Sequence, residues 1–195
     1  MENPFNTGFY ESHELRKMGF ARVGDHVQIA KSCTIVGLQN ISLGDYVRID
    51  AMCSIIATGP AVFGGRNHIG AFCHLVSRGG LELEMFAGLS QRVSIYTASD
   101  DYGGQYLTNP TVPERYTRSA VAPVHVGRHV IVGSGSVILP GVTLAEGASV
   151  GALSLVTKSL DPWTVYSGMP ARRLKERSRE LLALEAQLAA DAAGD

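Results

Sequence analysis

The sequence lacks the features that mark membrane, secreted and nucleic-acid-binding proteins. Its 195 residues hold 17 Lys and Arg against 18 Asp and Glu, so there is no basic excess for nucleic acid or a membrane surface. No segment approaches the ~18 uninterrupted apolar residues of a membrane-spanning helix. The N-terminal sequence MENPFNTGFYESHELRKMGF also lacks the charged-then-apolar pattern of a signal peptide. We therefore expect a cytoplasmic protein with no nucleic-acid partner and no membrane insertion.

Cysteine is scarce as well. The three cysteines, Cys33, Cys53 and Cys73, include no CxxC motif, and an odd number does not indicate a disulfide framework. Their spacing of twenty residues is instead the first sign of an internal repeat. In a reducing cytosol we expect them to be free thiols.

The repeat itself has a unit of six residues within longer stretches of about twenty. Ile41, Ala61 and Leu81 open the stretches that begin ISLGDYVRID, AVFGGRNHIG and LELEMFAGLS. The inward series at the six-residue spacing, in which only Phe63 is not aliphatic, is Val23, Ile29, Ile35, Leu43, Ile49, Ile55, Phe63, Ile69, Leu75, Leu83, Leu89, Ile95, Val126, Val132, Ile138, Leu144, Val150 and Val156. Six residues suit a short strand plus a turn, and three such units close one triangular coil of a parallel β-helix.

This pattern predicts an all-β chain in which residues 23–167 form a left-handed parallel β-helix of hexapeptide repeats. Residues 1–22 would form an N-terminal cap, and residues 168–195, rich in helix formers, a C-terminal α-helix. Residues 101–123, DYGGQYLTNPTVPERYTRSAVAP, break the repeat with three prolines. Loops of this length in compact domains are usually functional, so we expect an excursion loop that binds a ligand.

The stretch VIVGSGSVILPGVTLAEGASVGALSLVTKSLDPWTVYSGMPARRLKER resembles the hexapeptide-repeat acyltransferases, a left-handed β-helix family. The resemblance covers residues 23–175 and is greatest to the galactoside, maltose and surface-polysaccharide sugar acetyltransferases. It implies a homotrimer whose active sites lie between subunits. It also implies acetyl-CoA as donor and a sugar or nucleotide-sugar acceptor, in bacterial surface-polysaccharide biosynthesis.

The resemblance further implies a set of coenzyme contacts. Two small residues would line the pantetheine groove, a Thr-Lys pair would lie beside the adenine, and two cations would meet the phosphates. Cations also suit a 3′-phosphate on chemical grounds, and they are mildly unfavourable at the start of a helix, which favours a ligand role. The two small residues are Ser134 and Ala152. The Thr-Lys pair is Thr157 and Lys158, and the two cations are Arg172 and Lys175.

The catalytic position departs from the family. In the galactoside and maltose enzymes a histidine, the general base that removes the hydroxyl proton, ends the hexapeptide just before the loop. In this chain the hexapeptide that begins at Ile95 ends at Asp100 instead. Three hypotheses follow: His68 acts as base while Asp100 or Asp101 of an adjacent subunit orients it; the acceptor is an amine that a carboxylate can position; or the chain is inactive.

The same architecture also suits a γ-type carbonic anhydrase, in which three histidines between subunits hold zinc. His68 with His74, or His125 with His129, would be the candidate ligands. Because six residues separate His68 from His74, they fall on different sides of a coil and are poorly placed to share one ion. We therefore expect no metal. A β-helix without chemistry is a third alternative, and the choice between O- and N-acetylation stays open.

Overall fold

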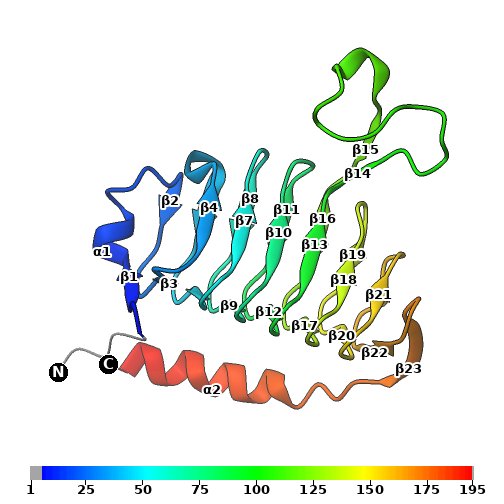
Figure 1. Cartoon of the computed structure of the whole chain (residues 1–195). Coiled ribbons are helices and arrows are strands. Elements are labelled where there is room, and N and C mark those ends of the chain that lie inside the picture. The colour runs from blue at the N-terminus through cyan, green and yellow to red at the C-terminus, as the bar shows by residue number, and fades with distance from the viewer. Residues whose placement is uncertain (1–5, 195) are drawn as a thin grey trace.

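The computed structural model describes residues 6–194, in which short strands recur at the predicted spacing and wind into a three-sided solenoid (Figure 1). The left-handed parallel β-helix is confirmed. Each strand pairs in parallel with its equivalent one coil away, as in the register His74↔Ser94 and Leu75↔Ile95. Within residues 6–194, no helix is long and apolar enough to cross a membrane.

The coil has three faces, which we number in the order in which the chain visits them. Face 1 is the six-stranded sheet of β2 (Arg22–Val23), β5 (Ile41–Leu43), β8 (Ala61–Phe63), β11 (Leu81–Leu83), β16 (Val124–Val126) and β19 (Thr143–Leu144). Face 2 contains the parallel strands β3 (Gln28–Ala30), β6 (Arg48–Ile49), β9 (His68–Ile69), β12 (Gly88–Leu89), β17 (Ile131–Val132), β20 (Ser149–Val150) and β22 (Thr164–Ser167). Face 3 is the six-stranded sheet of β4 (Thr34–Val36), β7 (Ser54–Ile56), β10 (His74–Val76), β13 (Ser94–Tyr96), β18 (Val137–Ile138) and β21 (Leu155–Val156).

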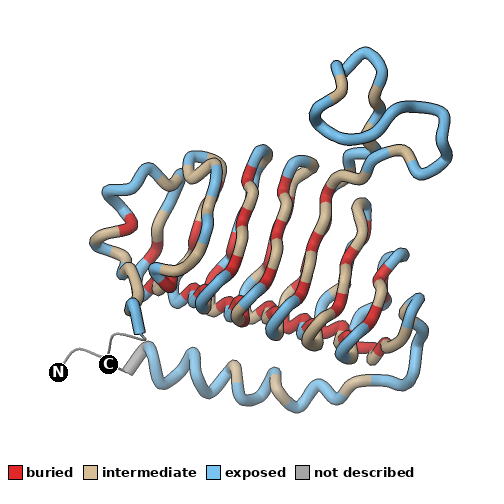
Figure 2. The backbone as a smooth tube through the Cα atoms, viewed as in Figure 1, coloured by how far each residue is buried: buried red, intermediate tan, exposed pale blue. Residues whose placement is uncertain are grey.

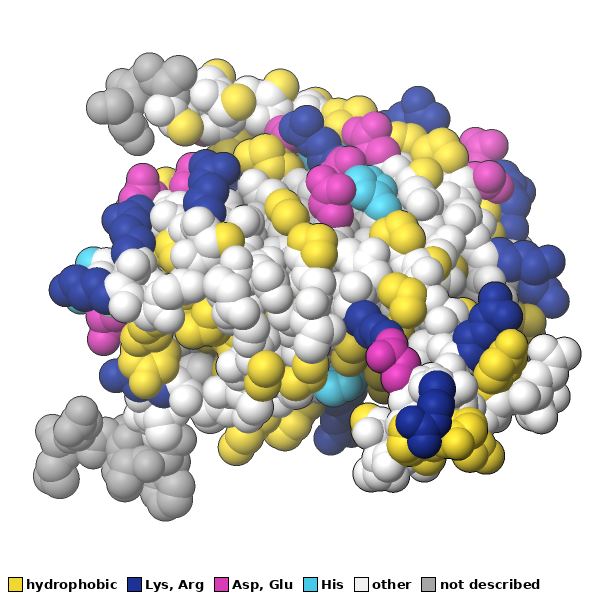
Figure 3. Space-filling model, turned by 90° about the horizontal axis from the view of Figure 1, so that it is seen from above, with side chains coloured by type: hydrophobic (Ala, Val, Ile, Leu, Met, Phe, Trp, Pro, Cys, Tyr) yellow, Lys and Arg dark blue, Asp and Glu magenta, His cyan; other side chains and the backbone are white. Residues whose placement is uncertain are grey.

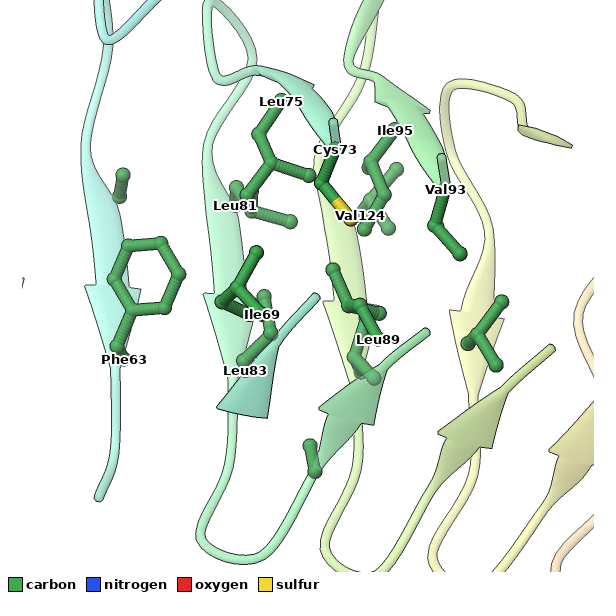
Figure 4. Packing of buried hydrophobic residues seen from close by; sticks show 14 of the residues in the cluster. Phe63, Ile69, Cys73, Leu75, Leu81, Leu83, Leu89, Val93, Ile95 and Val124 are labelled. Carbon is green, nitrogen blue, oxygen red and sulfur yellow. The ribbon is translucent and has the colours of Figure 1, made fainter. Parts of the chain in front are cut away.

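The core is the line of inward side chains that runs the length of the solenoid. Figure 2 shows that buried residues recur from coil to coil along it. Every position of the inward series is buried except Val23 and Ile35 near the N-terminal end, which are partly buried. Figure 4 shows how side chains of neighbouring coils, such as Ile69 and Leu89, pack against one another. Burial of one aliphatic side chain contributes roughly 1.5–3 kcal/mol, and repeating it in every coil stabilises the stack.

The cysteines lie in this inward line as free thiols. Cys53 and Cys73 are buried, and Cys33 is half-buried. Each Sγ donates to a backbone carbonyl in the next coil, at 3.1–3.2 Å. The three cysteines thus form a column of small side chains, at the spacing of twenty residues that the sequence shows.

The corners between faces are tight, and they use the left-handed backbone region without needing glycine. Met52, Phe72 and Arg92, at successive corners between faces 2 and 3, have φ of 60°, 63° and 60°. Backbone hydrogen bonds to the preceding coil, such as Phe72 N–H to Ala51 O at 3.1 Å, hold these turns. The side chains of Met52, Phe72 and Arg92 are exposed and point outward along this corner of the solenoid.

The excursion loop leaves face 3 after β13 and returns to face 1 at β16. Its root is an antiparallel hairpin of β14 (Ala98–Asp100) and β15 (Ser119–Val121), and the tip includes a 3₁₀ turn at Glu114–Tyr116. Figure 1 shows the loop standing away from the coils.

Further segments lie at both ends of the solenoid, and the C-terminal one differs from the sequence prediction. At the N-terminal end, β1 (Phe9–Glu11) pairs antiparallel with β3 and leads into the short helix α1 (Ser12–Leu15). A 3₁₀ turn at Leu38–Asn40 lies within the early coils. Residues 1–5 of the predicted cap, and Asp195, lie outside the described residues.

The predicted helix over residues 168–195 is wrong at its start. Residues Arg172–Glu176 form β23, which pairs antiparallel with β22, and helix α2 spans Leu181–Gly194. The physical reason is the edge of the last coil, whose N–H and C=O groups need partners. The chain turns back after Gly168 and supplies them before the helix begins.

Candidate functional site

The corner between faces 2 and 3 brings two of the predicted coenzyme residues into line. Ser134 and Ala152 occupy this corner in successive coils, and Leu153 N–H donates to Ser134 O at 2.9 Å. Gly133 permits the close approach, since a Cβ there would lie 2.4 Å from Ala152 N. Ser134 Oγ also donates to Gln91 Oε1 at 3.1 Å, which extends the line by one coil towards the N-terminus.

Three more of the predicted coenzyme residues meet at the C-terminal end of the solenoid. Thr157 and Lys158 follow β21, and Arg172 begins β23. Together they line one hollow of about 210 Å³, although Thr157 and Lys158 precede strand β22 and Arg172 follows it. Figure 3 shows Lys and Arg side chains at this end of the molecule. Such a hollow can accept an anionic group such as a phosphate.

Lys175 is the sixth predicted coenzyme residue. It lies on β23 opposite Val165, is exposed, and does not line that hollow. Ser134 and Ala152 are separated from the hollow by strand β21 of face 3. The structure thus divides the predicted set into a corner pair, a basic hollow and one isolated cation.

Asp101 organises the excursion loop from within. Its Oδ2 accepts the backbone N–H groups of Tyr106 and Gln105 at 2.8 and 2.6 Å, and its Oδ1 accepts that of Gly103 at 2.8 Å. The hydrogen bonds from Tyr106 and Gly103 hold the pKa of Asp101 below its usual value. A carboxylate engaged in this way is a loop anchor.

Asp100 is held differently. Its Oδ1 accepts the hydroxyl of Ser119 at 3.1 Å, and its Oδ2 accepts the backbone N–H of Asn109 at 3.0 Å. The residue is exposed and lines hollows on both sides of the loop root. Because each carboxylate oxygen can accept about two hydrogen bonds, Asp100 keeps capacity for a ligand while its orientation is fixed.

His68 lies on face 2 and is paired within its own chain. Its Nε2 is 2.7 Å from Oδ2 of Asp50, and Arg48 Nε donates to the other oxygen of Asp50 at 2.8 Å. Burial would raise the pKa of Asp50, but the hydrogen bonds from His68 and Arg48 outweigh it and hold that pKa below its usual value. The sequence interpretation missed Asp50, although its position beside Ile49 in the preceding coil was a usable signal.

The structure does not bring His68 and Asp100 together in one chain. His68 is on a strand of face 2, whereas Asp100 ends β14 beyond face 3. The hypothesis that Asp100 or Asp101 orients His68 therefore requires a second subunit, as it stated, and stays a prediction.

The histidines considered as zinc ligands do not converge on one point. His74 and His68 lie on different faces, His125 contacts Glu82 and Glu84, and His129 is buried against Glu185. Among the described side chains, no group of three His, Cys, Asp or Glu is placed to hold a metal ion.

Comparisons with known proteins give a relative over almost the whole chain and others over part of it. The dTDP-4-amino-4,6-dideoxy-D-glucose acyltransferase of Escherichia coli is 39% identical over 188 residues, which is 96% of this chain and 98% of that protein. The galactoside O-acetyltransferase of Escherichia coli K12 is 43% identical over 54 residues, or 28% of this chain and 27% of that protein. No family model matches the sequence.

Solved structures agree in fold. An N-acyltransferase from Bacillus cereus, in complex with dTDP and 3-hydroxybutyryl-CoA, superposes with a TM-score of 0.91 at 38% identity, over 96% of this chain and 99% of that one. Other structures of that protein carry substitutions of one aspartate or one serine, and some contain dTDP-4-amino-4,6-dideoxyglucose with coenzyme A. A maltose O-acetyltransferase from Clostridium difficile, 24% identical with a TM-score of 0.56 over 86% of this chain and 74% of that one, shares the fold.

Proposed function

The chain belongs to the left-handed β-helix family of sugar acyltransferases, and we propose that it transfers an acetyl group from acetyl-CoA to the amino group of a dTDP-linked 4-amino-4,6-dideoxyhexose. The observation that carries the choice of an amine is Asp100. A carboxylate occupies the place where the O-acetyltransferases of the family use a histidine, and it is fixed with ligand capacity to spare.

The chemistry of an amine suits a carboxylate. An amine has a pKa roughly near 8 and attacks a thioester once it is neutral, whereas a hydroxyl must lose its proton as it attacks. Asp100 attracts the ammonium form, accepts its first proton and later releases that proton to water. The amine nitrogen then forms a bond to the thioester carbonyl carbon, the carbon–sulfur bond breaks, and the thiolate takes the second proton.

Ser90 is a further candidate for the reacting centre. The aspartate and the serine substituted in the Bacillus cereus protein stand ten residues apart. In this sequence Ser90 and Asp100 form the one serine–aspartate pair with that spacing and order. Ser90 precedes Gln91, whose side chain bonds Ser134, so it lies on the same corner as the proposed pantetheine contacts.

The coenzyme would lie along this corner. Its pantetheine arm would follow Gln91, Ser134 and Ala152, because backbone groups at a coil corner can bond its amides. The phosphates would occupy the hollow of Thr157, Lys158 and Arg172. The thioester would then lie at the N-terminal end of the line, beside Ser90.

We also propose that the active form is a homotrimer in the cytoplasm, acting in the synthesis of a bacterial surface polysaccharide. Ser90 precedes β13 and Asp100 follows it, so the two lie at opposite ends of a face 3 strand in one chain. A site containing both is built most directly from two copies, and a closed cyclic assembly gives each site the same pair.

The test is acceptor selectivity. Purified protein is assayed for release of coenzyme A thiol with dTDP-4-amino-4,6-dideoxyglucose, its 4-hydroxy analogue, and the free amino sugar. We expect turnover with the nucleotide-linked amine at least about 100-fold above the other two. Preference for the hydroxyl acceptor would reject the amine proposal, and stoichiometric zinc with hydration of CO₂ would favour the carbonic anhydrase alternative.

O-acetylation is the second candidate, because one observation favours it. His68 is hydrogen-bonded to Asp50, and an imidazole oriented by a carboxylate is the arrangement that general-base catalysis on a hydroxyl uses. The same acceptor assay separates the two candidates.

A further inference from the structure

A chain of hydrogen bonds joins the solenoid to Asp100. Arg78 stands at the corner between β10 and β11, in the coil before the loop. Its Nη1 donates to Ser119 Oγ at 3.4 Å, and that hydroxyl donates to Asp100 Oδ1 at 3.1 Å. A serine hydroxyl has a single proton, so accepting from Arg78 directs that proton towards Asp100.

The backbone fixes both ends of this chain. Asp100 and Ser119 are directly opposed in the β14–β15 hairpin. Gly79 N–H donates to Thr97 Oγ1 at 2.9 Å, where the hairpin begins. A Cβ on Gly79 would lie 2.7 Å from the carbonyl oxygens of Ala122 and Thr97. The corner that presents Arg78 is therefore packed against the root of the loop, and its position relative to Ser119 is set.

The charges around Asp100 indicate what Arg78 does there. One hollow beside Asp100 contains the charged side chains of Arg78 and Glu114, and the other those of Asp101 and Arg118. Counting Asp100 with each, both hollows carry one positive and two negative charges. Such surroundings attract an ammonium group and disfavour a diphosphate. Arg78 is thus better suited to hold the carboxylate than to bind the phosphates of an acceptor.

We propose that Arg78 is a positioning residue that fixes the carboxylate of Asp100 through Ser119; this rests on the proposed role of Asp100 with an amine acceptor. Arg78 and Ser119 restrain one oxygen, and the Asn109 amide restrains the other. The unoccupied lone pairs of Asp100 are then aimed before the substrate arrives. Pre-orientation of this kind matters because a misplacement of about 1 Å can cost roughly 100-fold in rate.

The kinetic test compares Arg78→Ala, Ser119→Ala and the double variant with Arg115→Ala as control. Arg115 is a loop arginine whose guanidinium lies over the ring of Tyr116, 4.7 Å from its centroid, and no described contact joins it to Asp100. We expect kcat to fall roughly 10- to 100-fold in both single variants, with KM for acetyl-CoA unchanged. The double variant should be no worse than either single, since both break one chain of contacts. Arg78→Lys should recover part of the loss, and Arg115→Ala should keep wild-type kcat.

Other results would overturn the proposal. If Arg78→Ala raised KM for the acceptor at unchanged kcat, Arg78 would be a substrate contact. Additive losses in the double variant, or an equal loss in Arg115→Ala, would also reject the chain. The thermal midpoint is measured for each variant, and if Arg78→Ala fails to fold, Arg78→Lys and Ser119→Ala decide the question.

A second measurement is independent of activity. The Asn109 amide proton is bonded to Asp100 Oδ2, so its hydrogen exchange reports whether the carboxylate stays in place. We expect faster exchange in Arg78→Ala and Ser119→Ala and no change in Arg115→Ala. If the wild type acylates only hydroxyl acceptors, the proposed function fails. The role of Arg78 is then tested by itself. Faster Asn109 exchange and a lower kcat on the hydroxyl acceptor in Arg78→Ala would still support it, and no change in either would reject it.

Discussion

The Nε2 atom of His68 lies 2.7 Å from Oδ2 of Asp50, in the coil before it, and Arg48 holds the other oxygen of the same carboxylate. This contact gives His68 a partner on its own face of the solenoid. Because His68 and Asp100 lie apart in one chain, each can be substituted without disturbing the other. Mutation can therefore separate the hypothesis that His68 is the base from the hypothesis that the acceptor is an amine held by Asp100.

His68→Ala is the first test. With an amine acceptor we expect kcat to change by less than about 10-fold, because Asp100 and not His68 takes the proton. Asp50→Asn, which keeps the shape and removes the charge, should be equally mild. A fall of about 100-fold or more in kcat for both variants would instead identify His68 as the base and favour O-acetylation.

Asp100→Asn should abolish most of the activity. The amide keeps the size of the side chain but cannot take a proton, so we expect kcat to fall about 100- to 1,000-fold. KM for acetyl-CoA should stay within about twofold, because the proposed coenzyme contacts lie elsewhere. Steady-state kinetics with each substrate varied in turn separates the two parameters, and unchanged kcat would remove Asp100 from the mechanism.

Asp101→Asn should act on the loop. At neutral pH we expect faster proteolytic cleavage between residues 101 and 118, because the amide cannot anchor the three N–H groups as well as a carboxylate. Asp191→Asn, which changes an exposed aspartate of helix α2 away from the loop, is the matched control and should leave cleavage unchanged. If Asp101→Asn and the control were cleaved at the same rate as the wild type, Asp101 would be dispensable for the loop.

Acid should have the same effect on the wild-type loop. The pKa of Asp101 is lowered in the folded protein, so its contribution is complete above the unfolded value of about 3.9 and is lost as the pH falls through the lower folded value. We expect the near-ultraviolet signal of the loop tyrosines to change only below about pH 4. A transition near pH 6 would point to a histidine instead.

Arg172→Ala tests the proposed phosphate hollow. Losing a charge-assisted contact should raise KM for acetyl-CoA about 10-fold. The same variant should bind 3′-dephospho-CoA as the wild type does, if Arg172 meets the 3′-phosphate. Arg179→Ala is the control, since its guanidinium lies over Trp163, 5.4 Å from the ring centroid and outside the hollow. Equal weakening for both coenzymes would place Arg172 at another part of the ligand.

The sequence by itself determined the solenoid. Residues such as Ile69 and Leu89 recur at a period that only one register can bury, because a slip by one residue would turn the inward series outward. The loop was predictable for the same reason, since its prolines and polar residues interrupt that period. The resemblance placed Thr157 and Lys158 beside the adenine and Arg172 with Lys175 at the phosphates, whereas the structure puts Thr157, Lys158 and Arg172 around one hollow and Lys175 outside it.

Only the tertiary structure decided which polar groups meet. Asp50 with His68, and Arg78 with Ser119, are joined across coils or across a loop whose path no period specifies. Asp100 and Asp101 are adjacent and chemically alike. The carboxylate of Asp101 accepts three backbone N–H groups of the loop, whereas that of Asp100 accepts two hydrogen bonds and keeps more capacity for a ligand. Strand β23 formed where helix propensity predicted otherwise, because the edge of the last coil required hydrogen-bond partners that no local sequence reveals.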